Sequence, residues 1–181
     1  MKNLLFVLVL VFFTGCSTKQ TFISLKEYVP SQSIKSDKKA IVIASVNDMR
    51  TNKDVVATIA SASGEISEYV VLNNDVAIYF KNALLNELNS RGVSSSGENA
   101  VVANINITEL KANISGYASD NTKASIKVTL NASRGSETIT KNFADNQTKF
   151  ELIRTGGAFS PILKTMIDDM VKRVADGLIS L

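Results

Sequence analysis

The sequence of 181 residues contains no histidine, no tryptophan, two prolines and a single cysteine. Without histidine there is no imidazole to ligate a metal, to activate a serine or cysteine nucleophile, or to act as a base near neutral pH. One cysteine cannot form an intrachain disulfide or a thiolate metal site. We therefore expect no metal and no cofactor, and we assign no catalytic residue.

The sequence also lacks a strong charge of one sign and the loops that bind nucleotides. The 20 Lys and Arg nearly balance the 17 Asp and Glu, and no aromatic residues alternate with basic ones, so nucleic-acid binding is not expected. The Arg-Thr-Gly-Gly segment at 154–157 lacks phosphate-loop spacing and is predicted to be a flexible connection. Asp168 and Asp169, adjacent in the sequence, are predicted to lie on a solvated helix face.

The first sixteen residues have the pattern of a bacterial lipoprotein signal. A cationic start is followed by an apolar run at 4–13, which is too short for a bilayer that needs ~20 helical residues. The Phe-Thr-Gly-Cys segment at 13–16 resembles the lipobox, with Phe in place of the usual Leu. In lipoproteins of this type residues 1–15 are removed as a signal peptide and Cys16 becomes the acylated N-terminus, carrying chains such as palmitate. The alternative is an ordinary secretory signal beside a free cysteine.

Residue 17 bears on which membrane holds the anchor. An Asp at this position often retains such lipoproteins in the inner membrane, so Ser17 favours the outer membrane over the outer leaflet of the inner membrane. Because each buried lipid methylene contributes ~0.8 kcal/mol, several acyl chains anchor a protein without a spanning helix. We expect the membrane, bound through acyl chains on Cys16, to be one partner.

Residues 16–38 are predicted to be the lipidated cysteine and a tether. The segment is polar, contains Pro30 and lacks helical periodicity. As a flexible coil of ~20 residues it would span about 25 Å. Apolar residues between positions 20 and 30 leave open the alternative that this part is an edge strand. The lysine-rich run at 35–39 is predicted to be a solvated loop, with contact to anionic headgroups as the alternative.

Residues 39–181 are predicted to form a single α+β periplasmic domain that begins with three short strands. A β-branched apolar run at 40–46 predicts a buried strand. Apolar runs at 55–59 and 67–72, separated by small residues and Gly64, predict a hairpin. For the first of these two runs a short helix is the alternative.

The second half of the domain carries a meander and two helices. Alternation over 100–115, 124–132 and 137–146 predicts three antiparallel strands. Asn73 and Asn74 can cap an amphipathic helix that ends at Arg91-Gly92.

The last helix is predicted to begin with Ser160 as N-cap and Pro161 as first residue. Its predicted buried face comprises Leu163, Met166, Ile167, Met170, Val174 and Leu178. The expected fold is a two-layer sandwich of a mainly antiparallel sheet packed with two amphipathic helices.

The densest polar cluster, at 47–54, follows the first strand of the domain, where loops often carry sites. Asp48, Arg50 and Lys53 are its candidate partner-binding residues. The alternative is a turn in which Asp48 accepts backbone N–H bonds and pairs with Arg50 or Lys53.

Three short segments and the final helix carry a family resemblance. The segments are Val-Asn-Asp-Met-Arg-Thr at 46–51, Leu-Asn-Ser-Arg-Gly at 88–92 and Ile-Thr-Lys-Asn-Phe at 139–143. With the lipobox, they make the chain similar to the YajG-type uncharacterised lipoproteins of Gram-negative bacteria. The resemblance implies an envelope location and that family's fold, without an assigned activity. A looser likeness in element order links the chain to auxiliary lipoproteins of envelope ABC transporters.

These observations predict a non-enzymatic, membrane-anchored lipoprotein that faces the periplasm and binds another envelope component, with a protein as the candidate partner. The alternative is an accessory lipoprotein subunit of an envelope transport or assembly system. A third hypothesis is an enzyme acting on glycans or peptidoglycan, which needs two facing carboxylates ~5–9.5 Å apart.

Overall fold

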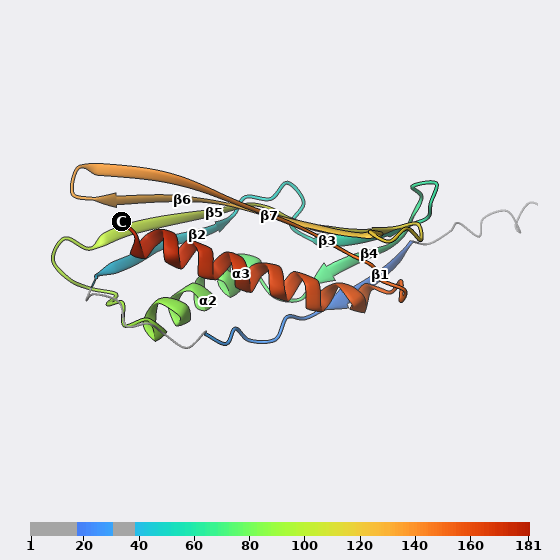
Figure 1. The fold of residues 1–181 in the computed structure, drawn as a ribbon, viewed down its shortest axis with the longest axis horizontal. Coiled ribbons are helices and arrows are strands. Elements are labelled where there is room, and N and C mark those ends of the chain that lie inside the picture. Colours follow the sequence, from blue (N-terminus) through green and yellow to red (C-terminus); the bar gives the residue numbers. More distant parts are fainter. Residues whose placement is uncertain (1–17, 31–38) are drawn as a thin grey trace, which may run out of the picture.

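A computed structural model describes residues 18–30 and 39–181, and within them one seven-stranded sheet carries two helices on one face (Figure 1). In chain order the elements are β1 (Lys19–Ile23), β2 (Ile41–Asp48), β3 (Val55–Ala60), β4 (Ile66–Leu72), α2 (Val76–Ser90), β5 (Val101–Ser115), β6 (Thr122–Arg134), β7 (Glu137–Lys149), the 3₁₀ turn η2 (Gly156–Ala158) and α3 (Phe159–Ile179). The predicted α+β class is confirmed.

The sheet combines antiparallel and parallel pairs. β5, β6 and β7 form the predicted antiparallel meander. On the other side of β5, β2 pairs in parallel with its first half and β3 in parallel with its last residues. β4 pairs antiparallel with β3, which confirms the predicted hairpin and excludes the helix alternative at 55–60. Most paired residues lie in antiparallel ladders, but the parallel pairs are a difference from the prediction, because pairing between distant segments leaves no local pattern in the sequence.

A bulge in β5 changes which side chains face the helices. Up to Ile107 the odd-numbered residues are buried, whereas Leu110, Ala112 and Ile114 are buried beyond the register shift between Ile107 and Glu109. A bulge inserts one extra residue in a strand and so reverses the alternation after it. β5 therefore keeps its apolar face on the core along both halves of the sheet.

The core lies between the helices and this apolar face. The six α3 residues predicted to be buried are all buried, and they meet side chains from the sheet such as Ile105, Ile126 and Leu130. α2 contributes Phe80 and Leu84, which are fully buried. The methionines of α3 are thus core residues. Within the described part of the chain, no helix combines the length and apolar character needed to cross a membrane.

The N-terminal segment belongs to the folded body, and the edge strand that was the alternative for part of the predicted tether at 16–38 is confirmed at Lys19–Ile23. Residues 19–30 are therefore not a free tether. β1 is an edge strand that pairs in parallel with β4, from Lys19 beside Glu68 to Ile23 beside Leu72. The reason is hydrophobic burial, because Ile23, Leu25 and Tyr28 lie in the core. Residues 31–38, and with them most of the lysine-rich run, lie outside the described residues.

The predicted N-cap of α2 is corrected. Asp75, rather than Asn73 or Asn74, caps α2, since its carboxylate accepts the N–H of Ile78 at 2.8 Å. The two asparagines instead hold the N-terminal segment: Asn74 Oδ1 accepts the N–H of Leu25 at 2.7 Å, and Asn73 donates to Ser24 at 3.0 Å.

At the other helix, α3 begins at Phe159 with Ala158 at the N-cap position, so the predicted Ser160 cap is wrong. Pro161 falls in the first turn, where no intrahelical N–H is needed. The preceding connection is packed rather than flexible, because Gly156 is buried and donates its N–H to Glu68 at 2.9 Å.

Candidate functional site

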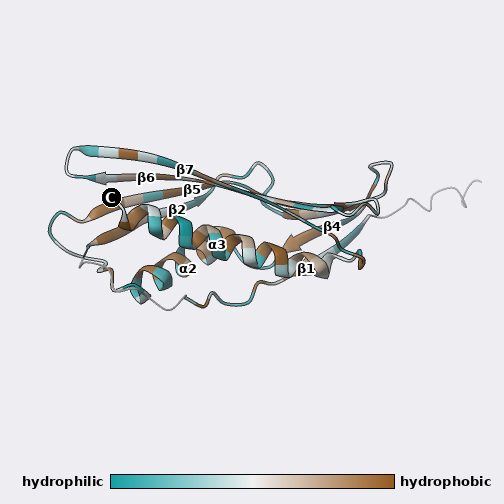
Figure 2. Ribbon diagram, viewed as in Figure 1, coloured by the Kyte–Doolittle hydropathy of each residue, from teal (hydrophilic) through white to brown (hydrophobic). Residues whose placement is uncertain are grey.

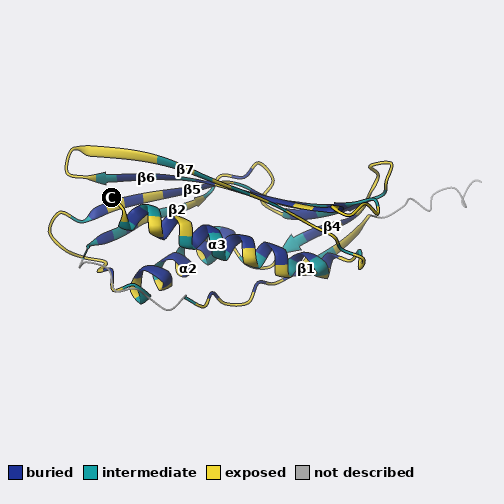
Figure 3. Cartoon of the chain, in the orientation of Figure 1, coloured by how far each residue is buried: buried dark blue, intermediate teal, exposed yellow. Residues whose placement is uncertain are grey.

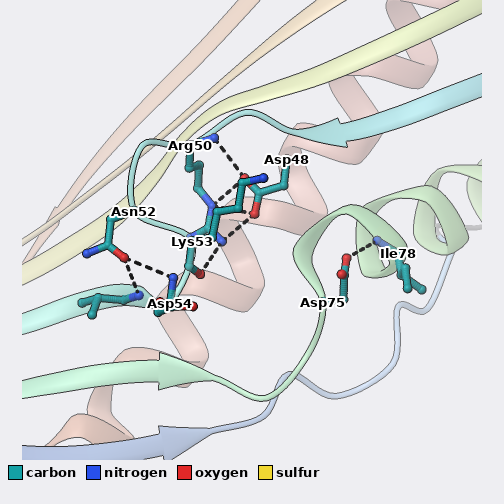
Figure 4. A network of polar contacts seen from close by, with 8 residues as sticks. Asp48, Arg50, Asn52, Lys53, Asp54, Asp75 and Ile78 are labelled. Atoms are coloured by element: carbon teal, nitrogen blue, oxygen red, sulfur yellow. Dashed lines mark hydrogen bonds and ion pairs between the residues drawn. The ribbon is translucent and has the colours of Figure 1, made fainter.

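The Asp48–Asp54 loop is built around one largely buried ion pair (Figure 4). Arg50 binds Asp48 through two parallel contacts, Nε to Oδ1 at 2.9 Å and Nη2 to Oδ2 at 2.8 Å. The backbone N–H of Arg50 also donates to Asp48 Oδ1 at 3.1 Å. The two-residue spacing of Asp and Arg thus closes a tight turn at the end of β2.

Arg50 ties this turn to the rest of the loop. Its Nη2 donates to the carbonyl of Lys53 at 2.9 Å, and its side chain is 5% exposed. Nη1 is buried and has no hydrogen-bond partner among the described residues. Asn52 completes the loop, since its Oδ1 accepts the N–H groups of Asp54 and Val55, both at 3.1 Å.

The ion pair sets the protonation state of Asp48. Burial acts to raise the pKa of this carboxyl, but the hydrogen bonds and charge of Arg50, with the charge of Lys53, outweigh burial and hold the pKa below its usual value. Asp48 is therefore ionised at neutral pH and occupied by Arg50.

This loop forms one wall of a groove of about 690 Å³, and the end of β4 and the start of α2 form the opposite wall (Figure 4). The capping residue Asp75 lies on that opposite wall. Most residues of the loop are exposed, and they include the cation Lys53 and the apolar Met49, which is 61% exposed. The groove can therefore offer a cation and an apolar side chain to a partner.

The three residues predicted for partner binding come together, but they differ in availability. Asp48 and Arg50 satisfy each other in the turn that was the alternative interpretation of this segment. Lys53 contributes its carbonyl to that turn and exposes its side chain. Cys16, the predicted lipidation site, lies outside the described residues.

A second polar cluster, which the sequence interpretation missed, fixes the N-terminal segment on the helices. The carboxylate of Glu87, on α2, is fully buried; it accepts the phenol of Tyr28 at 2.6 Å and the Nε of Arg91 at 2.8 Å. Arg91 also pairs with Asp176 of α3. Burial, followed by the hydrogen bond to Glu87, raises the pKa of Tyr28 well above its ordinary value, so the phenol remains a donor.

The burial of Glu87 was signalled in the sequence, because Glu87 falls in phase with the apolar stripe of Phe80, Ala83, Leu84 and Leu88.

Asp168 and Asp169, both predicted to lie on a solvated helix face, differ in exposure. The side chain of Asp169 is half exposed, whereas that of Asp168 is mostly buried and pairs with Lys164. Within residues 18–30 and 39–181, His, Cys, Asp and Glu form no group of three that could hold a metal.

A family match shows the class of protein. The family described as "Uncharacterized lipoprotein" (Lipoprotein_16) matches residues 28–178, and this chain belongs to that family. This confirms the resemblance to uncharacterised bacterial lipoproteins, and membership indicates a membrane-anchored location in the cell envelope. No curated protein matches the sequence.

Several solved structures are similar to this chain at low identity, and the first of them shares its fold. Protein XCC0632 from Xanthomonas campestris, of the family named DUF330, has a TM-score of 0.63 and 8% identity over 88% of this chain and 95% of its own. Rare lipoprotein B from Shewanella oneidensis has a TM-score of 0.43 and 11% identity, over 74% of this chain and 92% of its own. A minor lipoprotein from Acinetobacter baumannii has a TM-score of 0.40 and 14% identity, over 68% and 91%.

Proposed function

We propose that this lipoprotein is anchored in the outer membrane through acyl chains on Cys16, faces the periplasm, and acts without catalysis by binding another envelope component. The observation that carries the proposal is the groove between the Asp48–Asp54 loop and the start of α2. Its buried ion pair fixes the shape of the loop, while Lys53 and Met49 stay free to contact a partner. A rigid loop loses little conformational entropy on binding.

The chemistry of the groove favours binding over turnover. Of the three carboxylates that line it, Asp48 is paired with Arg50 and Asp75 accepts the N–H of Ile78 as the cap of α2, whereas Asp54 is exposed. A general base or nucleophile needs a carboxylate free to reach the substrate, so a catalytic role of the groove would depend on Asp54. Turnover of peptidoglycan or a glycan by the purified mature protein, lost on Asp54→Asn, would overturn the non-enzymatic part of the proposal.

Photocrosslinking in cells tests the binding site. With a photoreactive residue at position 53 we expect one dominant adduct, because a specific partner seated in the groove lies within reach of that side chain. The matched control is position 138, an exposed residue of β7 outside the groove lining. A diffuse and equal pattern from both positions would contradict the assignment of the groove.

The accessory-subunit role is the second candidate, and a second groove favours it. This groove, of about 590 Å³, lies between residues 25–28 and α2 and is lined in part by Ile78 and Leu85. Its apolar side chains suit a partner segment better than the polar Asp48–Asp54 loop does. If the dominant adduct forms at Asn82, which lines this groove, and the captured protein is a transport or assembly component, the accessory role replaces the first proposal.

A further inference from the structure

Four loops and strand ends gather at the end of the sheet where β1 begins (Figure 1). Strand register places the β3–β4 turn, the β5–β6 turn and the end of β7 there, since Ala60 lies beside Ser115, Ile114 beside Thr122, and Thr122 beside Lys149. The loop from β7 to η2 also begins at this end. We call this part of the molecule the β1 end.

Figures 2 and 3 colour the ribbon by hydropathy and by burial, and at the β1 end four large apolar residues are exposed. Tyr117, in the β5–β6 turn, is 78% exposed. Leu152 and Ile153, in the loop after β7, are 76% and 66% exposed, and Phe150 is also exposed. These four residues form what we call the apolar end patch. Clusters of this kind mark interaction surfaces more often than singly exposed apolar residues do.

The patch is held in a defined shape by contacts between its loops. Asn121 donates to the carbonyl of Glu151 at 2.8 Å and accepts the Glu151 N–H at 2.9 Å. The guanidinium of Arg154 lies 4.9 Å from the centre of the Tyr117 ring and donates to the carbonyl of Ala60. The two loops therefore present their apolar side chains together.

The start of β1 lies close to the anchor along the chain. Lys19, the first residue of β1, follows Cys16 by three positions. Three residues reach at most ~11 Å when fully extended. An acylated Cys16 therefore keeps the start of β1 within ~11 Å of the anchor, which exceeds the headgroup layer of roughly 5–8 Å by only a few ångströms. So short a link leaves no space for a folded protein between this end and the lipid.

We propose that the apolar end patch rests in the interface of the membrane that holds Cys16, with phospholipid as its partner. The inference rests on the proposed anchor. Tyr and other amphipathic aromatic residues are enriched at this depth of a bilayer. Two of the nearby lysines are compensated, since Lys149 pairs with Glu151 at 3.3 Å and Lys19 with Glu68 at 3.5 Å, while Lys123 is exposed. Contact is therefore mainly apolar, and it should depend only modestly on salt and on anionic lipid.

The absence of tryptophan makes the test direct, because Leu152→Trp introduces a single tryptophan. The full acylated chain is reconstituted in phosphatidylcholine vesicles. We expect blue-shifted emission, quenching by brominated lipid, and a several-fold lower iodide quenching constant than for Ile139→Trp. Ile139 is the matched control, because it is 41% exposed on the same strand that leads to the patch. It lies ten residues before Lys149, about 33 Å along the strand.

The possible results separate the patch from the anchor. If the protein floats with the vesicles and both tryptophans are quenched equally by iodide, the patch assignment is wrong and the anchor stands. If the acylated chain does not float with vesicles, the anchor fails and the patch inference fails with it. Ile153→Trp serves as a second reporter if Leu152→Trp alters the thermal unfolding of the protein.

Discussion

At the scale of single residues, Arg50 is the side chain on which the candidate site depends. Its guanidinium satisfies the Asp48 carboxylate and the Lys53 carbonyl in a nearly closed environment. Removing one member of a buried ion pair leaves the other charge without compensation, whereas an exposed lysine contributes little to stability. Arg50 and Lys53 therefore have different roles although both are basic residues of one loop.

Replacing Arg50 by Met should destabilise the mature protein by about 2–4 kcal/mol, because Asp48 and the Lys53 carbonyl lose their donors. The control, Lys53→Met, removes an exposed charge and should change the free energy of unfolding by less than about 0.5 kcal/mol. Urea denaturation of both variants measures the difference. Equal effects from the two substitutions would contradict the structural role given to Arg50.

The sequence alone predicts the local pair of the candidate site but not the groove around it. The Asp-x-Arg spacing at 48 and 50 suffices to predict a local pair, since the two residues lie within one turn. The groove was not predictable, because its second wall comes from the start of α2, which tertiary packing places opposite the loop. The partner of buried Glu87 was likewise not predictable, because Tyr28 lies 59 residues away along the chain.

At the scale of elements, the docking of β1 is the feature that most changes the picture of the chain. The connection before α3 packs against the pair of β1 and β4, because Gly156 lies close to Thr21 and Glu68. A Cβ atom on Gly156 would lie 2.6 Å from Glu68 Oε1 and 2.7 Å from Thr21 Cβ, whereas one on Gly157 would meet nothing closer than 4.0 Å. Neighbouring glycines therefore provide a matched pair.

We expect Gly156→Ala to loosen β1 and to cost about 1–3 kcal/mol, because overpacking forces backbone shifts. Gly157→Ala should be close to neutral. Hydrogen exchange at β1 and thermal unfolding measure the two effects, with faster exchange at Lys19–Ile23 expected in the first variant only. Unchanged exchange in Gly156→Ala would mean that this connection does not hold β1 in place.

The sequence predicts an element correctly where that element has its own apolar periodicity. The meander, α2 and α3 each repeat an apolar pattern over many residues, and all were predicted. β1 is five residues long and mostly exposed, and its partner β4 lies far along the chain, so its sequence resembles a polar linker. The parallel pairs of β2 and β3 with β5 are set by tertiary arrangement for the same reason.

At the scale of the whole molecule, the proposed anchor at Cys16 would fix which end of the sheet lies at the membrane, because β1 begins only three positions later. Residues of the β1 end lie nearest the anchor, whereas the β6–β7 hairpin lies at the opposite end of the sheet (Figure 1). The Asp48–Asp54 loop follows β2, whose pairing with β5 ends at Ile107, midway along β5. An anchored protein would thus hold its candidate groove about half the length of β5 away from the membrane rather than on a long tether.

Acylation of Cys16 is the central claim, because both the proposed location and the orientation at the membrane depend on it. Metabolic labelling with an alkyne fatty acid, followed by separation of inner and outer membranes, tests it directly. We predict that the wild-type protein and the surface control Lys53→Met are labelled and found in the outer membrane, and that Cys16→Ala carries no label. Label on Cys16→Ala, or unlabelled wild-type protein in the soluble periplasmic fraction, would contradict the account.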